Sequence, residues 1–248
     1  MEEKNEMTAK RRLRLGDLDL SVIDPFGRDT EYIYNEIFAG RTYDHPQIKL
    51  RERPTIVDVG ANIGLFTIWA ARKHRPATIL AYEASPTTYE YLIENVARHV
   101  DSEVTAVTCF SLAVSREADR ELVLHQPPYT SGRSTILDGS TLPWIDDLRD
   151  KGELLTHTVR STTISRAMAV HGLGVIDLLK VDVEGYFMEV LDGIAPADNT
   201  RVRNLVLEAE YVEALGYTGE SICAMLRDKG YSVEAQDAAQ IMIYAWRS

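Results

Sequence analysis

Short apolar runs of strand length alternate with longer stretches of helical periodicity downstream of Pro54. The alternation predicts a parallel, doubly wound sheet with helices on both faces, which is an α/β fold. The runs that predict strands lie at residues 55–59, 78–82, 104–110, 175–181 and 202–208, with helices at 65–74, 86–100 and 219–229. Two last runs, at residues 231–233 and 241–245, predict an antiparallel pair that closes the sheet.

Upstream of Pro54 the pattern is different and predicts a frayed tail followed by a small cap. Residues 1–10 are polar, and residues 11–24 alternate around Gly16-Asp17 as a hairpin does. Residues 29–39 begin with acidic residues and carry the apolar positions of a short helix, which Gly40 ends.

These patterns predict two regions, a tail and cap at residues 1–53 and one main domain at residues 54–248. Residues 125–152 contain many turn residues and few periodic signals, so we expect a loop insertion there. Long loops in compact domains often close over a site, and this insertion is therefore a candidate substrate lid.

Composition narrows the possible partners. The net charge is −11, which disfavours a nucleic-acid substrate because phosphate backbones repel an acidic chain. No stretch reaches the roughly 18 apolar residues of a membrane span, and no signal peptide is visible. Cys109 and Cys223 do not form a CxxC pair, which favours a reduced, cytoplasmic setting and disfavours structural zinc.

The most informative motif is Asp58-Val59-Gly60-Ala61-Asn62-Ile63-Gly64, between the first main strand and the first helix. Gly60 and Gly64 permit a tight turn, so that backbone N–H groups can approach a polar ligand closely. Asp58 stands where a carboxylate suits a cationic group, such as the α-amine of S-adenosylmethionine. Glu83 ends the second strand, where an acid can hold ribose hydroxyls.

Two other interpretations of this motif stay open. A dinucleotide site prefers G-x-G-x-x-G around a pyrophosphate, but Asn62 occupies the middle glycine position and Asp58 would repel that anion. The motif can also be only a tight strand-to-helix turn that binds no ligand.

At this point the sequence resembles the FkbM-type methyltransferases. The resemblance is carried by TIVDVGANIGLFT (55–67), YEASPTTYEYLIENV (82–96), IDLLKVDVEG (176–185) and EVLDG (189–193), and it spans roughly residues 50–235. It implies a Rossmann-like class I methyltransferase fold and S-adenosylmethionine as cofactor. It also implies O-methylation of a small hydroxylated molecule, such as a sugar or natural-product intermediate. The cofactor residues it implies are Asp58, Gly60, Ala61, Asn62, Gly64, Thr67, Glu83, Ser111, Leu112 and Asp182.

Three positions depart from the family pattern. Ser111 stands where the family usually has Asn, and Ser165 where it usually has Asp. Phe187 stands where an acid usually follows the glycine of DVEG, which puts a shared acidic or metal role for that helix in doubt.

Carboxylates at the ends of later strands are the candidate catalytic groups. Asp182 is the first choice, as general base or as ligand of the cofactor amine, with Lys180 on the same strand face and Glu184 nearby. The alternative is a buried ion pair that only positions the strand. Mg²⁺ bound by Asp182, Glu184 and Glu208 is a further alternative, but a metal is not predicted.

Acceptor contacts are expected from Arg133 and Ser134 in the insertion and from Glu210 after the fifth strand. Arg133 can instead be an exposed loop charge, and His157 is interpreted as structural. The tyrosines Tyr32, Tyr34 and Tyr43 are candidates to cover the cofactor. N- or C-methylation, or a non-catalytic cofactor-binding module, remain alternatives, and a homodimer is left open.

Overall fold

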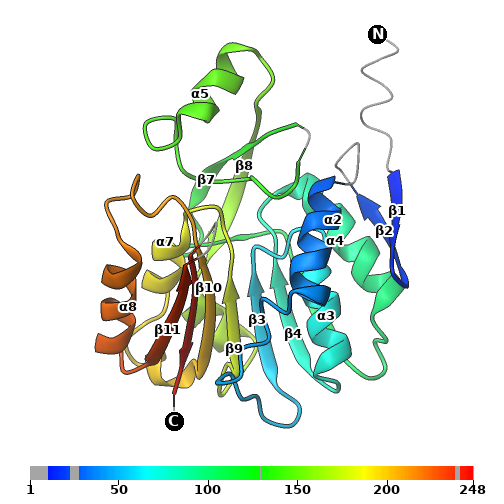
Figure 1. Ribbon diagram of the computed structural model, residues 1–248, viewed down its shortest axis with the longest axis vertical. Coiled ribbons are helices and arrows are strands. Elements are labelled where there is room, and N and C mark those ends of the chain that lie inside the picture. Colours follow the sequence, from blue (N-terminus) through cyan, green and yellow to red (C-terminus); the bar gives the residue numbers. More distant parts are fainter. Residues whose placement is uncertain (1–10, 23–27, 129, 238–240, 248) are drawn as a thin grey trace.

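The computed structural model describes residues 11–22, 28–128, 130–237 and 241–247. Its centre is a seven-stranded sheet with the order β11-β12-β10-β9-β3-β4-β5 (Figure 1). The strands are β3 (Thr55–Val59), β4 (Thr78–Tyr82), β5 (Ala106–Phe110), β9 (Leu178–Val181), β10 (Asn204–Ala209), β11 (Ser232–Asp237) and β12 (Ile241–Trp246). Only β12 runs antiparallel to its neighbours, so the predicted doubly wound sheet with an antiparallel C-terminal strand is confirmed.

Helices cover both faces of this sheet because apolar residues occupy alternate positions on both sides of its strands. Ile56 and Ile79 pack toward α3 (Leu65–Lys73), whereas Val57 and Leu80 pack toward the opposite face. The first face also holds α4 (Pro86–His99). The second holds α6 (Ile164–Val170), α7 (Phe187–Asp192) and α8 (Gly219–Asp228), with the 3-10 turn η2 (Asn199–Arg201) before β10.

The predicted hairpin and helix upstream of Pro54 are both present. The strands β1 (Arg11–Leu15) and β2 (Leu18–Val22) pair in antiparallel fashion. The helix α2 (Arg28–Tyr34) continues into the π-helical turn η1 (Asn35–Ala39). Leu18 and Leu20 are fully buried against the α3 side of the sheet, so the hairpin shares the core of the main sheet. The predicted tail at residues 1–10 lies outside the described residues, and the division at residue 53 stays a prediction.

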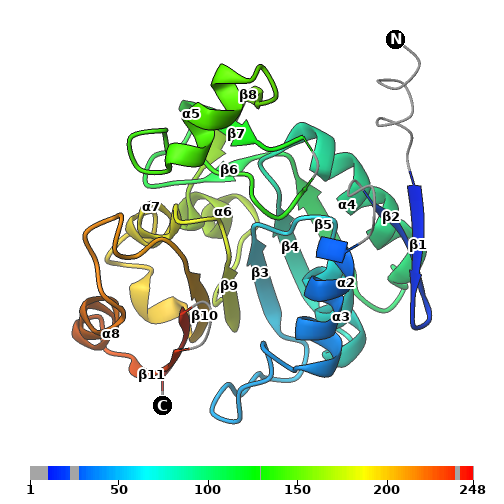
Figure 2. The same ribbon diagram turned by 45° about the horizontal axis from the view of Figure 1, so that its top comes forward.

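The insertion is more ordered than the sequence predicted. It contains the helix α5 (Pro143–Asp150), and it is flanked by a small sheet of β6 (Ala113–Val114), β8 (Leu155–Thr162) and β7 (Glu121–Gln126). The predicted loop insertion over residues 125–152 thus contains the helix α5 and the last residues of β7, and its role as a lid stays a prediction. α5 begins with a proline in its first turn and buries Ile145. Because the helix is short, these features give only a weak sequence signal. Figure 2 shows the insertion lying beyond one end of the central strands.

Strand and helix boundaries otherwise agree within a few residues. The run at 175–181 is a regular strand only from Leu178, and an isolated bridge joins Ile176 to Val202 before it. No helix in the described parts of the chain is long and apolar enough to cross a membrane.

Candidate active site

The turn between β3 and α3 brings two strand ends into close contact. Gly60 has a φ of +76°, and a Cβ placed on it would lie 1.7 Å from the carbonyl oxygen of Asp182. Asn62 (φ +51°) and Gly64 (φ +97°) complete the left-handed backbone of the turn. The turn is therefore open to backbone contacts with a ligand, and Gly60 has no room for a side chain.

A buried lysine joins the ends of β3 and β9. Lys180 is the register partner of Asp58 on the neighbouring strand. Its Nζ lies 3.2 Å from Asp58 Oδ1, 3.2 Å from Asp182 Oδ2, and donates to the Gly60 carbonyl at 2.7 Å. Burial alone would lower the pKa of Lys180, but the two carboxylates raise it above its ordinary value, so the lysine stays charged. Thr67 Oγ1 donates to the second oxygen of Asp58 at 2.6 Å.

Glu83 supports the same turn from the end of β4. Its two oxygens accept the backbone N–H of Asn62 at 2.9 Å and that of Ser85 at 2.8 Å. Burial raises the pKa of Glu83 to about 7, although the two N–H groups oppose this shift. Ser85 Oγ then donates to Gln126 Oε1 at 2.7 Å, which connects the acid to the end of β7.

A cavity of about 860 Å³ opens beyond this turn, between the carboxyl ends of the strands, the insertion and the N-terminal helices. This position is where α/β sheets of this topology bind ligands. Predicted site residues on its wall are Gly60, Ala61, Asn62, Glu83, Leu112, Arg133, Ser134, Lys180, Asp182, Glu184, Glu208 and Glu210.

Four predicted cofactor residues do not line this cavity, namely Asp58, Gly64, Thr67 and Ser111. Asp58 and Thr67 are fully buried beneath the turn. There the Asp58 carboxylate pairs with Lys180 and accepts a hydrogen bond from Thr67. The Asp58 carboxylate thus faces Lys180 and Thr67 and does not line the cavity, and its contact with a cationic ligand stays a prediction. Asp58 holds Lys180, which in turn holds the Gly60 carbonyl.

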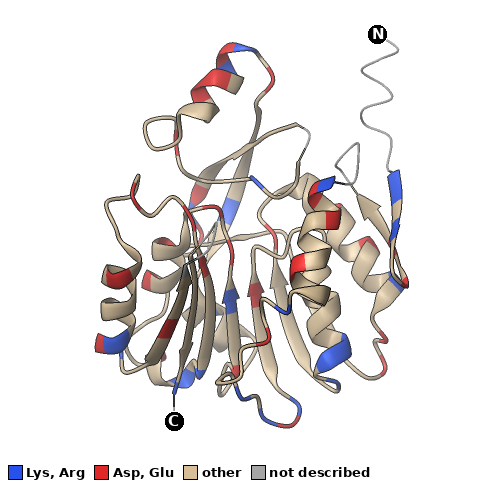
Figure 3. Cartoon of the chain, in the orientation of Figure 1, with Lys and Arg blue, Asp and Glu red and all other residues tan. Residues whose placement is uncertain are grey.

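Several carboxyl groups line the same cavity. Figure 3 shows acidic segments where the central strands end. Glu184, Glu208 and Glu210 are largely buried, and their pKa values are raised by burial first and then by the charges of neighbouring carboxylates. Burial also raises the pKa of Glu36, which η1 brings to the same cavity. A cationic ligand bound here would favour the ionised forms of these carboxyls, whereas an anionic ligand would oppose their ionisation further.

A metal site is not assembled in the described residues, where no group of three or more His, Cys, Asp or Glu side chains is arranged to hold an ion. The alternative in which Asp182, Glu184 and Glu208 bind Mg²⁺ therefore has no geometric support. This observation concerns the side-chain arrangement alone.

The insertion contacts the turn that follows β9. Thr135 Oγ1 donates to the Glu184 carbonyl at 2.7 Å, and Tyr211 Oη donates to the Glu184 carboxylate at 3.1 Å. Glu184 (φ +50°) and Tyr211 (φ +52°) both have left-handed backbones on the cavity wall. Left-handed non-glycine residues persist only where surrounding contacts hold them, and they gather at functional sites.

Several cavity residues were not predicted from the sequence. Tyr186, Tyr211 and Trp144 line the cavity, and Glu36 enters it from the N-terminal segment. Tyr32 and Tyr43 reach the cavity as expected, whereas Tyr34 stacks on Phe38 away from it. His157 lies on β8, outside the cavity wall. The positive φ of Glu184 and of Tyr211 cannot be predicted from the sequence, because neither residue type favours a left-handed backbone.

The strand order, the glycine turn after the first core strand and the acid after the second are those of a class I S-adenosylmethionine-dependent methyltransferase. The chain matches the family model described as the methyltransferase FkbM domain over residues 58–233, and it belongs to that family. The cofactor of a methyltransferase of this family is S-adenosylmethionine.

Relatives cover most of the chain. It is 33% identical over 227 residues to the 31-O-demethyl-FK506 methyltransferase FkbM of Streptomyces tacrolimicus, covering 84% of each chain. It is 33% identical over 223 residues to methyltransferase sdnD of Sordaria araneosa, covering 83% of each. A solved precorrin-6y C5,15-methyltransferase from Geobacter metallireducens is 17% identical, with a TM-score of 0.48, and the match covers 86% of this chain and 88% of the other.

Proposed function

We propose that this methyltransferase acts on a hydroxyl group of a small natural-product or sugar intermediate. The observation that carries the proposal is one cavity whose wall contains both the glycine turn and several carboxyl groups. The relative named a 31-O-demethyl-FK506 methyltransferase supports an oxygen acceptor on a small molecule. N- or C-methylation remains the alternative that product analysis must distinguish.

The cavity residues divide into cofactor and acceptor contacts. On the cofactor side, the backbone of Ala61 and Asn62 faces the ligand. Glu83 accepts hydrogen bonds from the ribose hydroxyls, and Leu112 packs against the nucleoside. Because the cofactor carries a sulfonium and an ammonium group, its binding favours the ionised forms of Glu184 and Glu208, whose pKa values are otherwise raised. On the acceptor side, Arg133, Ser134 and Glu210 contact the substrate.

When bound, S-adenosylmethionine supplies an already activated methyl group, so the protein must orient the acceptor and remove its proton. Asp182 is the proposed base, because its side chain is 30% exposed on the cavity wall while Lys180 fixes its second oxygen. The acceptor hydroxyl would give its proton to Asp182, with Glu184 as the neighbouring alternative.

The test is Asp182→Asn, with Asp192→Asn on the exposed side of α7 as control. We expect the single-turnover rate to fall by about 10²- to 10⁴-fold, while the affinity for S-adenosylhomocysteine changes little. A ¹³C-labelled methyl group followed by NMR in a panel of hydroxylated, amino and carbon acceptors identifies the atom methylated. An unchanged rate in Asp182→Asn contradicts the assignment of the base, and no labelled product with any acceptor supports a non-catalytic module.

We also propose a cytoplasmic location, which fits two free cysteines, Cys109 and Cys223. The acceptor is a small molecule rather than a nucleic acid, in keeping with the net charge of −11. A homodimer stays open and is tested by light scattering.

A further inference from the structure

Asn95 connects three parts of the molecule that are distant in sequence. It lies on α4 and is fully buried. Its Nδ2 donates to the carbonyl of Ile63 at 2.9 Å and to that of Ser21 at 3.0 Å, while its Oδ1 accepts the N–H of Ser21 at 2.7 Å. Both amide protons are therefore used, and the oxygen is occupied as well.

The two partners of Asn95 differ in kind. Ile63 stands inside the cofactor turn, between Asn62 and Gly64, which both have positive φ. Ser21 belongs to β2 of the N-terminal hairpin and does not line the cavity. A turn with left-handed residues keeps its shape only where its backbone groups are fixed, and Asn95 fixes one of its carbonyls.

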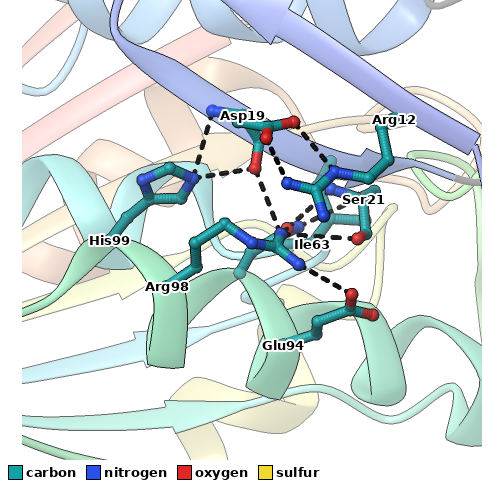
Figure 4. A network of polar contacts seen from close by, with 8 residues as sticks. Arg12, Asp19, Ser21, Ile63, Glu94, Arg98 and His99 are labelled. Carbon is teal, nitrogen blue, oxygen red and sulfur yellow. Dashed lines mark hydrogen bonds and ion pairs between the residues drawn. The ribbon is translucent and has the colours of Figure 1, made fainter.

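Other contacts hold the hairpin against the helices that flank the turn. Arg98 Nη1 donates to the Asp19 carbonyl at 3.1 Å, and His99 Nε2 lies 3.1 Å from the Asp19 nitrogen (Figure 4). Arg72 of α3 pairs with Asp17 at 2.8 Å. The buried side chains of β2 pack in the same apolar cluster as Ile63. Hairpin and turn thus form one packed unit, with Asn95 as the direct polar link.

We propose that Asn95 is a positioning residue that couples the N-terminal hairpin to the cofactor turn. This inference rests on the proposed role of residues 60–64 in holding the cofactor. It has two consequences: loss of the Asn95 amide weakens cofactor binding without touching the cofactor, and cofactor binding stabilises the hairpin. The second follows because coupling between two sites is reciprocal.

The first measurement is calorimetry with S-adenosylhomocysteine on Asn95→Ala and a matched control, Asn204→Ala. Asn204 is also a buried asparagine whose Nδ2 donates to two carbonyls, those of Asp177 at 2.7 Å and Lys49 at 3.3 Å, away from the cavity. Both variants lose thermal stability, but only Asn95→Ala weakens binding, by roughly tenfold or more, because buried carbonyls near the turn lose their donors. Equal affinities in the two variants overturn the proposal.

The second measurement uses the unmodified protein, so it does not depend on a variant that folds poorly. Hydrogen exchange is followed with and without S-adenosylhomocysteine over the hairpin at residues 11–22. Bound ligand slows exchange there if the coupling exists, and unchanged hairpin exchange alongside slowed exchange at residues 60–66 overturns it. If the unmodified protein shows ligand binding but no protection of the turn at all, the cofactor-turn assignment fails instead, so the two failures are distinguishable.

Discussion

Gly60 shows how tightly a single position can be constrained. An alanine there meets the Asp182 carbonyl oxygen 1.7 Å from its Cβ and must also adopt a φ of +76°. We expect Gly60→Ala to lower the free energy of unfolding by more than about 3 kcal/mol and to abolish binding of S-adenosylhomocysteine, since relief requires the ends of β3 and β9 to separate.

The control for this prediction is Gly172→Ala. Gly172 has a φ of +61° but nothing lies within 4 Å of a Cβ placed on it, so only the conformational strain of about 1–2 kcal/mol applies. Urea unfolding and calorimetry compare the two variants. If both lose the same stability and both still bind, the close approach of the two strand ends is not a constraint in solution.

The residue scale also shows where sequence reasoning succeeded and failed. The shared face of Lys180 and Asp182 was predictable, because side chains alternate along a strand. The burial of Asp58 was not, because it depends on the register that sets Lys180 of β9 beside it. A carboxylate at a strand end looks the same in sequence whether it faces a ligand or a lysine of the neighbouring strand.

At the scale of elements, a hydroxyl group of the insertion bonds the turn that follows β9. Thr135 Oγ1 donates to the carbonyl of Glu184, whose φ is +50°. We expect Thr135→Val to lower kcat about tenfold, because the Glu184 carbonyl loses its hydrogen-bond donor. The affinity for S-adenosylhomocysteine should stay within twofold, because Glu184 is proposed to act on the acceptor and not on the cofactor.

Thr156→Val is the matched control for Thr135→Val, since Thr156 is an exposed threonine on β8, next to the insertion. Steady-state kinetics and calorimetry separate turnover from cofactor binding. Equal kcat values in the two variants would show that the insertion does not act through Glu184.

Elements with a strong local period were predictable, and elements defined by distant contacts were not. The strands of the central sheet follow from their apolar runs, and α4 follows from its apolar period and from the Ser85-Pro86 cap. Ser85 does accept the N–H of Thr88, as an N-cap residue should. The contribution of Glu36 to the cavity could not be predicted, because it depends on how η1 packs over the strand ends. The wall of the site is thus partly built by segments whose sequence carries no motif.

At the scale of the whole molecule, an acidic chain with a net charge of −11 concentrates several buried carboxyl groups in one cavity. Burial and neighbouring charges raise the pKa values of Glu184 and Glu208 above those of exposed carboxyls, and burial raises that of Glu83 to about 7. At a pH between the ordinary carboxyl pKa and these raised values, the carboxyls of the unfolded chain have lost their protons, whereas those of the folded protein still hold them. Stability must fall as the pH rises through this range, because the folded state binds more protons there.

Glu208→Gln tests this relation, since the amide keeps the shape but cannot ionise. Tyr43 Oη donates to Glu208 at 3.4 Å, and the glutamine carbonyl can accept the same bond. We expect the Tm advantage of the variant over the unmodified protein to grow by about 2–4 °C between pH 5.5 and pH 8.5, the shift that roughly 1 kcal/mol gives in a domain of this size. Differential scanning calorimetry across that range is the measurement, with Glu121→Gln at an exposed position of β7 as control. An advantage that stays constant with pH would mean that Glu208 is ionised in the folded protein at all these values, and that Lys180 rather than a bound proton offsets its charge.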